Sequence, residues 1–339
     1  MRMEAVDKCL LCGGFGRVIY EGIGDRLFHV LGSFDFYRCA KCDFIWLNPR
    51  PAKEDIPKCY EDYCTHAIIN QGNQQVSFRK LRRKFRDMIL CARYGIPMKN
   101  PKKSALILGS ILGRIPILRR RVTLNEGVFP PWTADGRLLD IGCGNGYFLS
   151  FMQKIGWRVS GVDIDHEAAR LAREAYKIPV FVGTLDKAGF SDRSFDAVTM
   201  SHVIEHAPAP VDLLMESYRI ISRGGYLCIA TPNFKSLGHA IFRRNWFALD
   251  PPRHLYLWTP GALYKAVEKA GFRILSCKTS SANAAFIFTQ SHLIKTQGRA
   301  NLKSPISASA RMYGWLEAAA NQIFHSLGED IYLLAQRKS

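Results

Sequence analysis

Three glycines stand at every second position in the stretch RLLDIGCGNGYF, which begins at Arg137: Gly142, Gly144 and Gly146. The stretch is typical of a buried strand that runs into a tight turn and then a helix. Glycine lets the backbone of such a turn come close to a ligand, and the helix offers unpaired N–H groups to it. Asp163 ends a second expected strand about twenty residues on, where a carboxylate can accept hydrogen bonds from both ribose hydroxyls of a nucleoside. The sequence therefore predicts a nucleoside-binding βαβ unit.

An acid, Asp140, opens the glycine turn, and the third glycine comes one residue earlier than in the G-x-G-x-x-G fingerprint of dinucleotide sites. A carboxylate at this position would repel a pyrophosphate, but it suits a ligand that carries an ammonium and a sulfonium group. In these residues the chain resembles the Rossmann-like S-adenosylmethionine-dependent methyltransferases, whose first motif has this acid-x-Gly-x-Gly-x-Gly form. The resemblance covers about residues 132–280 and 328–337. It implies S-adenosylmethionine as the cofactor.

The resemblance also implies roles for single residues. Asp140 and the three glycines would hold the methionine part of the cofactor, Asp163 would hold the ribose, and Ile164 would pack on the adenine. Ser201, which follows the fourth expected strand at Ala197 to Met200, completes the expected cofactor-binding set together with Asp186.

Asp186 is included because the chain departs from the family's pattern nearby. The family often has an acid directly after the glycine of the third strand's loop, where it contacts the adenine amino group. Here Gly183 is followed by Thr184, and the acid comes two residues later. Asp186 is therefore a candidate adenine contact, and the alternative is a solvated loop acid.

Histidines follow the strands that point toward the transferred methyl group. Methyl transfer is an in-line displacement, so the protein must place a nucleophile and, for a hydroxyl, remove its proton. His202 follows the fourth expected strand and His254 lies in a long aromatic loop after the fifth, which makes both candidate general bases. Each could equally be a histidine ordered by backbone hydrogen bonds. Glu205 and His206 are weaker catalytic candidates, because they begin a helix and favour packing or an orienting role.

Two cysteine pairs near the N-terminus predict a metal site. Cys9 and Cys12 in CLLC, and Cys39 and Cys42 in CAKC, can each offer two thiolates to one tetrahedral zinc. The glycine-rich stretch between the pairs predicts a β-hairpin, and the pairs match a subgroup of the resembled family that carries an N-terminal zinc module. We expect a structural zinc, since four protein ligands leave no open position for catalysis. The alternative is four unmetallated thiols.

A basic segment lies between Arg79 and Arg121, where fourteen Lys or Arg residues accompany one acid in a chain of net charge +18. Within it, Ser104 to Leu118 is apolar but shorter than the about 20 residues that span a bilayer. Three interpretations stay open: an interfacial helix on anionic lipid, a helical arm packed on the catalytic domain, or a contact surface for nucleic acid.

Alternating strand and helix patterns after residue 132 predict an α/β fold with a doubly wound sheet. The resemblance implies seven strands, with the last one antiparallel. We expect a zinc-ribbon-like module over residues 1–52 and a basic helical arm over 53–131. The cofactor-binding core would follow over 132–280, a helical insertion or cap over 281–327, and the last strand of the core over 328–339.

Three functions compete at this point. The favoured one is O-methylation of a small molecule, a sugar or a lipid-linked glycan near the membrane surface. The second is methylation of an RNA base, with sugar C-methylation as a related alternative, although SHVIEH replaces the Asn/Asp-Pro-Pro-aromatic motif of many amino-group methylases. The third is a non-enzymatic zinc-ribbon scaffold. The charged N-terminus lacks the pattern of a secretory signal, so we expect a cytoplasmic protein, with peripheral contact at the inner membrane surface left open.

Overall fold

The structure is a computed structural model that describes residues 1–60, 77–98, 101–115, 118, 122–123, 128–133 and 135–338. The chain divides into two compact units. The first unit holds Met1–Tyr63, His202–Met215 and Ile229–Leu333, and the second holds Cys64–Ser201, Glu216–Cys228 and Leu334–Ser339. Arg119 to Arg121 of the expected basic segment lie outside the described residues.

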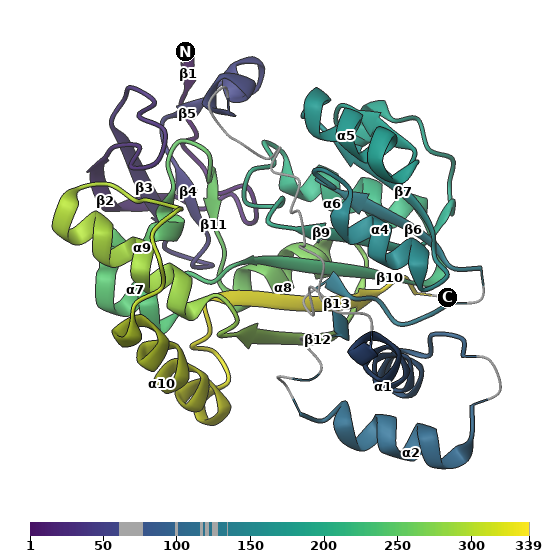
Figure 1. Cartoon of the computed structure of the whole chain (residues 1–339). Helices are drawn as coiled ribbons and strands as arrows, with labels where there is room; N and C mark the ends of the chain where they lie inside the picture. Colours follow the sequence, from purple (N-terminus) through teal and green to yellow (C-terminus); the bar gives the residue numbers. More distant parts are fainter. Residues whose placement is uncertain are drawn as a thin grey trace. The chain divides into compact units, whose positions relative to one another are not determined.

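A seven-stranded sheet has the order β12-β13-β10-β9-β6-β7-β8. β6 pairs in parallel with β7 and β9, and β7 pairs in parallel with β8. β13 is antiparallel, and Arg337 just beyond it exchanges backbone hydrogen bonds with Gly224 and Gly225 of β10. Figure 1 shows β10, β13 and β12 side by side. The bounds of these strands are β6 (Arg137–Ile141), β7 (Arg158–Asp163), β8 (Val180–Val182), β9 (Phe195–Ser201), β10 (Ile221–Pro232), β12 (Arg273–Ser280) and β13 (Asp330–Gln336). The strand order and directions confirm the predicted fold class.

The second unit builds the glycine turn from buried parallel strands. Four of the five residues of β6 are buried, as expected for a central strand with helices over both faces. Asp165 caps α5 by accepting hydrogen bonds from two backbone N–H groups of its first turn, which fixes where that helix begins after β7. Helices near the sheet include α4 (Tyr147–Lys154), α5 (His166–Tyr176) and the 3-10 helix η3 (Leu185–Lys187) of the second unit. α6 (Pro210–Ile220) is divided between the units, and α8 (Pro260–Lys269) of the first unit contacts β12.

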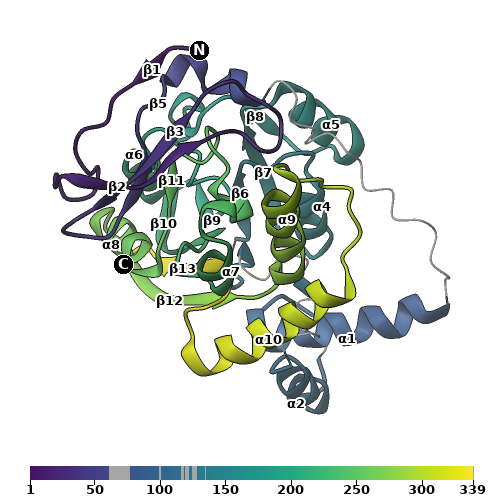
Figure 2. The ribbon, with the colours of Figure 1, turned by 90° about the vertical axis from the view of Figure 1, so that its left-hand side faces the viewer.

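A smaller, four-stranded sheet lies in the first unit, in the order β11-β4-β3-β2. β2 (Gly16–Ile23) and β3 (Phe34–Cys39) form an antiparallel hairpin, as Figure 2 shows. The hairpin follows the first cysteine pair and ends at Cys39 of the second. β4 (Ile45–Leu47) pairs with β3 on one side and with β11 (Tyr256–Leu257) on the other. The loop after β10 therefore supplies the edge strand of the N-terminal sheet.

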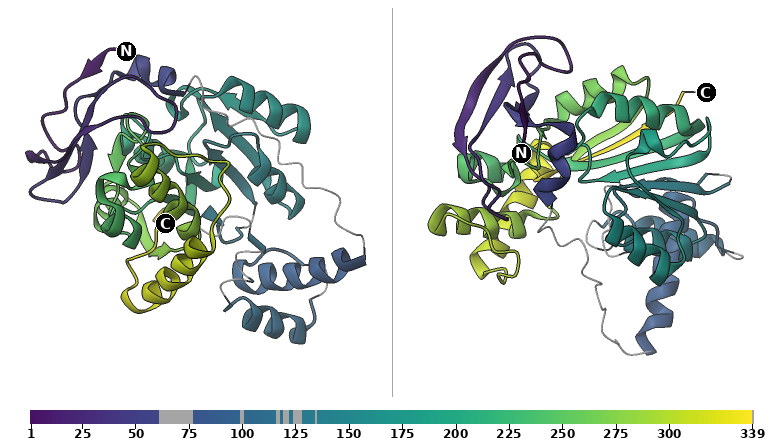
Figure 3. Two further views of the ribbon diagram at one scale, coloured as in Figure 1. Left: turned by 60° about the vertical axis from the view of Figure 1, so that its left-hand side comes forward. Right: turned by 90° about the horizontal axis from the view of Figure 1, so that it is seen from above.

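Two of the described helices lie in the expected basic arm. α1 (Ser77–Tyr94) and α2 (Lys103–Leu112) lie side by side, as Figure 3 shows. They approach closely at Gly109, where an added Cβ would stand 2.3 Å from the Met88 carbonyl oxygen.

The expected insertion between the last two strands is also helical. It holds α9 (Ala284–Gln297) and α10 (Ala308–Phe324), which contact each other through the rings of Phe288 and Tyr313 at 4.6 Å. Among the residues that the structure describes, no helix is long and apolar enough to cross a membrane.

Candidate active site and cysteine cluster

The glycine turn connects β6 to α4 with all three glycines at positive φ: 69° at Gly142, 53° at Gly144 and 76° at Gly146. A Cβ at Gly146 would stand 2.7 Å from the Ala172 side chain, so glycine lets α5 approach the turn. At Gly144, no described atom outside its own neighbours comes within 4 Å of an added Cβ. The space beside Gly144 is therefore open for a ligand to meet the backbone.

Asp163, at the end of β7, is held against this turn by hydrogen bonds. Gly144 N donates to its Oδ2 at 2.7 Å, and Asp165 N donates to its Oδ1 at 2.9 Å. Burial raises the pKa of Asp163, and the backbone donors oppose that rise. A carboxylate oxygen can accept more than one hydrogen bond, so the fixed side chain can still receive ribose hydroxyls.

Asp140 is a buried carboxyl next to the glycine turn. Thr199 Oγ1 of β9 donates to its Oδ1 at 2.6 Å. Burial raises the pKa of Asp140 to about 7, the hydrogen bond from Thr199 opposes the rise, and the charge of Asp163 adds to it. A cationic ligand group beside Asp140 would hold this carboxyl in its ionised form.

The remaining expected cofactor residues lie in the same unit. Ile164 follows Asp163 with more than half of its surface exposed, which suits a flat apolar ligand. Asp186 is exposed in η3, which follows β8, and Ser201 is the last residue of β9. The binding roles of all these residues stay predictions.

The four candidate catalytic residues form one cluster in the first unit. Directly after β9, His202 has a φ of 54°, a value that a residue with a side chain seldom adopts. Its Nδ1 lies 3.4 Å from Glu205 Oε1 and its Nε2 lies 3.9 Å from Asp330 Oδ1, while 42% of the side chain is exposed. Burial would lower the pKa of His202, but the contact with Glu205 and the charges of Asp330 and Glu205 outweigh it and raise the pKa to about 9.

Glu205 is the buried centre of this cluster, and Thr231 Oγ1 donates to its Oε2 at 2.9 Å. Its backbone oxygen accepts from Leu255 N at 2.9 Å and from Tyr256 N at 3.2 Å. These bonds tie the loop around His254 to the segment that follows β9. Burial would raise the pKa of Glu205, but His202 and the neighbouring imidazoles lower it to about 2.

His206 and His254 are neutral imidazoles whose rings lie 4.7 Å apart. Nδ1 of His206 is 2.9 Å from the Arg253 carbonyl oxygen, and Nδ1 of His254 is 2.8 Å from that of Ala248. A carbonyl only accepts, so each Nδ1 carries the proton and each Nε2 keeps a lone pair. The Tyr60 hydroxyl, also 2.9 Å from Nδ1 of His206, then accepts from the same N–H. Burial is the main cause that lowers both pKa values, that of His206 to about 4.

One carboxylate oxygen of Glu205 and one ring nitrogen each of His206 and His254 lie within 4.8 Å of one another. Two neutral imidazoles and a carboxylate are a donor set that suits a divalent cation, and the carbonyl partners of both Nδ1 atoms fit that role. The sequence shows Glu205 and His206 side by side, but nothing in it signals that the loop with His254 returns to them.

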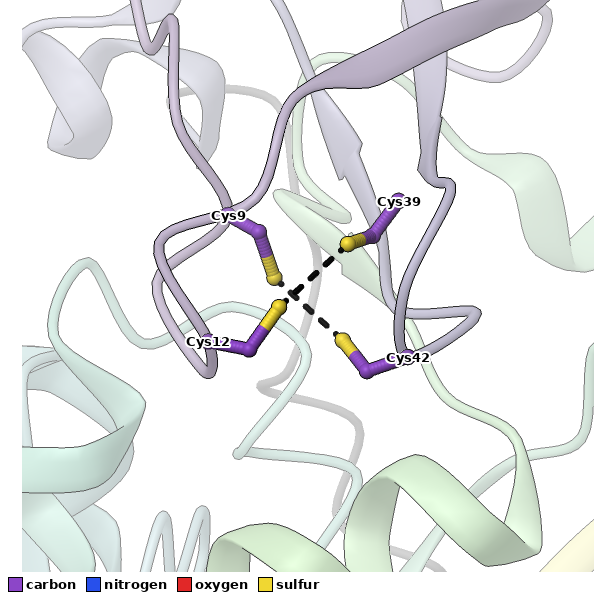
Figure 4. A group of neighbouring side chains, drawn as sticks. All are labelled: Cys9, Cys12, Cys39 and Cys42. Atoms are coloured by element: carbon purple, nitrogen blue, oxygen red, sulfur yellow. Dashed lines mark hydrogen bonds between the residues drawn. The ribbon is translucent and has the colours of Figure 1, made fainter.

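The four N-terminal cysteines converge, as Figure 4 shows. Sγ of Cys9 lies 3.5 Å from that of Cys42, and Sγ of Cys12 lies 3.4 Å from that of Cys39. Four thiolates at a Zn–S distance of about 2.3 Å would stand about 3.8 Å apart on a tetrahedron. The cluster therefore has nearly the size that one zinc ion requires.

Comparisons with known proteins agree with this geometry. Residues 119–277 match a family model described as a methyltransferase domain. The ubiquinone biosynthesis O-methyltransferase of Alkalilimnicola ehrlichii is 34% identical over 159 residues, which are 43% of this chain and 64% of that protein. The protein of the same name from Xanthomonas oryzae pv. oryzae is 32% identical over 106 residues, 30% of this chain and 44% of that one. The chain thus spans between 44% and 64% of the length of these relatives.

Solved structures with a similar arrangement share less sequence. A possible histamine N-methyltransferase from Thermotoga maritima is 21% identical with a TM-score of 0.41, covering 61% of this chain and 84% of that one. An S-adenosylmethionine-dependent methyltransferase from Archaeoglobus fulgidus is 24% identical with a TM-score of 0.43, covering 66% and 92%.

The family model, the strand order and the glycine turn agree with one another. The residues that match the methyltransferase domain include β6 to β10 and the glycine turn between β6 and α4. This match supports the class that the first motif predicted, an S-adenosylmethionine-dependent methyltransferase.

Proposed function

We propose that this chain transfers a methyl group from S-adenosylmethionine to a hydroxyl of a small molecule, a sugar or a lipid-linked glycan near the membrane surface. The observation that carries the proposal is the cluster of His202, Glu205, His206 and His254, which begins one residue after the last residue of β9. Two of its imidazoles are neutral at pH 7 and can take a proton. The O-methyltransferase relatives support the same reaction for the part of their length that matches.

The second unit would bind the cofactor. The open backbone at Gly144 and the carboxyl of Asp140 would receive the methionine part, Asp163 would bind the ribose, and Ile164 would cover one face of the adenine. Asp186 would contact the adenine amino group. The ammonium of the ligand would supply the positive charge that a buried carboxylate such as Asp140 requires.

Proton removal is the step for which the chain must supply a base. The hydroxyl oxygen attacks the methyl carbon, the carbon–sulfur bond breaks with its electrons on sulfur, and the hydroxyl proton must leave. His254 holds a lone pair on Nε2 at neutral pH, whereas the raised pKa of His202 keeps that imidazole protonated. We therefore assign proton acceptance to His254 and positioning of the acceptor oxygen to His202.

A second role for the same cluster is divalent-cation binding by Glu205, His206 and His254. Such a cation would polarise the acceptor oxygen as a Lewis acid. Measuring the rate of methyl transfer before and after chelation distinguishes proton acceptance by His254 from cation binding by the cluster. A rate that EDTA leaves unchanged supports His254 as the base, and a rate that falls with EDTA and returns with Mg²⁺ or Mn²⁺ supports the cation.

The proposed reaction is tested by incubating the protein with methyl-labelled S-adenosylmethionine and fractions of lipids, glycans and RNA. Label in a glycan or lipid product that resists RNase would support the proposal. Label in RNA, or absorbance at 260 nm that RNase removes from the purified protein, would replace it with the RNA alternative. Failure of the folded protein to bind the cofactor would contradict both.

We further propose that Cys9, Cys12, Cys39 and Cys42 hold one structural zinc. The sulfur distances of 3.4 and 3.5 Å across the cluster support it. With four protein ligands, the ion would have no open position for chemistry. Its role would be to join the ends of β2 and β3 to the knuckles that precede and follow them.

A further inference from the structure

α10 packs on the protein through a polar face. Its buried residues are Ala310, Tyr313, Glu317 and Asn321. Tyr313 donates to Glu317 at 2.6 Å, while Asn321 Oδ1 accepts from Thr279 Oγ1 at 2.7 Å and Asn321 Nδ2 donates to the Thr279 carbonyl at 3.0 Å. These hydrogen bonds fix which side of the helix faces inward.

The opposite side of α10 is apolar and exposed. Met312, Trp315, Leu316 and Ile323 recur at helical spacing on one face, and between 61 and 80% of each residue is exposed. Trp315 is the most exposed of the four. A surface helix of a globular protein normally has the reverse arrangement, with its apolar residues inward. The hydrogen bonds of the inner face show that a rotation of α10 cannot bury this stripe.

The exposed charged side chains of the segment that contains α10 have one sign. From Ser281 to Gly328 the sequence contains a single acid, Glu317, and its side chain is fully buried. The same segment carries Lys295, Arg299, Lys303 and Arg311, and Leu302 and Ile306 are exposed in the loop that precedes α10. The accessible part of this segment is thus apolar and cationic, without a negative side chain.

We propose that α10 docks on a lipid bilayer that contains anionic headgroups, with its apolar stripe in the interfacial layer. An interfacial helix needs an apolar face that includes aromatic residues and cations beside it, and anionic lipid complements those cations. Trp315 supplies the amphipathic ring that favours the boundary between headgroups and hydrocarbon. The inference goes beyond methyl transfer and does not depend on it, because vesicle binding is measured without an acceptor.

α10 is distinct from the apolar helix that the sequence singled out. α2 also exposes apolar side chains, among them Ile107 and Ile111. Of the cations that flank it, Lys102 and Lys103 are described, and Arg119 to Arg121 lie outside the described residues. For α10, the apolar stripe and all the cations of its segment are described.

Co-sedimentation with vesicles tests the proposal, using phosphatidylcholine alone and phosphatidylcholine mixed with phosphatidylglycerol. The full chain should bind the anionic vesicles, bind the neutral ones far less, and lose affinity as salt is added. Trp315→Ser combined with Ile323→Ser should lower the partition coefficient by about tenfold or more. The tryptophan emission of the wild type should shift to the blue, and the shift should be lost in this variant.

Three controls show whether a loss of vesicle binding is specific to α10. Met215→Ser removes an exposed apolar side chain from α6 and should leave vesicle binding unchanged. Ile107→Ser with Ile111→Ser tests α2. Unchanged cofactor binding and thermal unfolding would show that the variants fold. The proposal is overturned if the folded wild type does not bind anionic vesicles, or if only the α2 variant loses vesicle binding. It is also overturned if the chain forms a dimer that Trp315→Ser abolishes and does not bind vesicles, because the stripe would then be a dimer interface.

Discussion

The backbone N–H of Gly144 donates a hydrogen bond of 2.7 Å to Oδ2 of Asp163. This bond joins the turn after β6 to the end of β7, so the carboxylate that we propose as the ribose contact also shapes the turn. A substitution of Asp163 should therefore weaken cofactor binding in two ways: it removes a contact with the ligand, and it also removes the hydrogen bond that holds the turn.

Asp163→Ala should weaken the binding of S-adenosylmethionine by about a hundredfold or more, since it removes charge-assisted hydrogen bonds that contribute about 1.5 to 3 kcal/mol each. Titration calorimetry measures the effect. Glu174→Ala, which removes an exposed acid from α5, is the control and should bind normally. Binding within threefold of wild type in Asp163→Ala would contradict the assigned ribose contact.

Gly144→Ala and Gly189→Ala form a matched pair. Both glycines have positive φ, 53° and 66°, and neither has a described atom outside its own neighbours within 4 Å of an added Cβ. Each substitution should lower the free energy of unfolding by about 1 to 2 kcal/mol through backbone strain. Only Gly144→Ala should also abolish cofactor binding, because the new methyl group would occupy the ligand's place. Equal cofactor affinity in the two variants would show that no ligand approaches Gly144.

Cofactor affinity should rise with pH through the titration of Asp140. Burial raises the pKa of this carboxyl to about 7 in the free protein, and an ammonium group binds only its ionised form. Between pH 6 and 7.5 the ionised fraction, and hence the affinity, should grow roughly fivefold to tenfold and then level off. Asp140→Asn should bind weakly with no such dependence. Calorimetry in buffers of different ionisation enthalpy should also detect proton release in the wild type alone.

His254→Asn should lower kcat by about a hundredfold or more, the usual effect of losing a general base. The asparagine amide can replace Nδ1 as donor to the Ala248 carbonyl, so the loop should stay folded. His202→Ala should raise the KM for the acceptor more than it lowers kcat. His292→Ala, on α9, serves as the control. Full activity of His254→Asn would remove His254 from the mechanism.

Loss of zinc should destabilise the sheet of β2, β3 and β4. Purified protein should contain one zinc ion per chain by atomic absorption, and Cys12→Ser should reduce that content and lower the midpoint of thermal unfolding by several degrees. Cys277→Ser, outside the cluster, should retain the ion. A wild-type protein that contains no metal and unfolds identically after chelation would leave four thiols as the correct description.

The parts of the fold that the sequence predicted are those set by local pattern. The strand from Arg158 and the one before His202 are short apolar runs that end at polar residues, and the structure has them as β7 and β9. Glycine spacing located the turn at Gly144 because only glycine adopts its φ without strain. Cysteine spacing likewise predicted a cluster, because two knuckles can present four sulfur atoms to one point.

The parts that the sequence did not predict depend on contacts between distant segments. The pairing of Tyr256 with Trp46 joins residues about two hundred positions apart, and no periodicity encodes it. The backbone hydrogen bonds that bring the loop of His254 to Glu205 likewise join segments about fifty positions apart, and no local pattern encodes them. The apolar spacing in α10 showed a helix, but periodicity alone normally indicates the buried face. Here the polar residues Glu317 and Asn321 occupy that face.

The pairing of β11 with β4 makes the N-terminal sheet and the histidine loop dependent on each other. The cysteine module produced alone would present β4 as an open edge, which is a template for aggregation. A truncated chain without the module would remove the β4 partners of Tyr256 and Leu257, so that the loop around His254 would keep its backbone hydrogen bonds to Glu205 but lose those to the N-terminal sheet. The cysteine module is thus a structural support of the candidate catalytic loop, and we expect the two to be lost or inherited together.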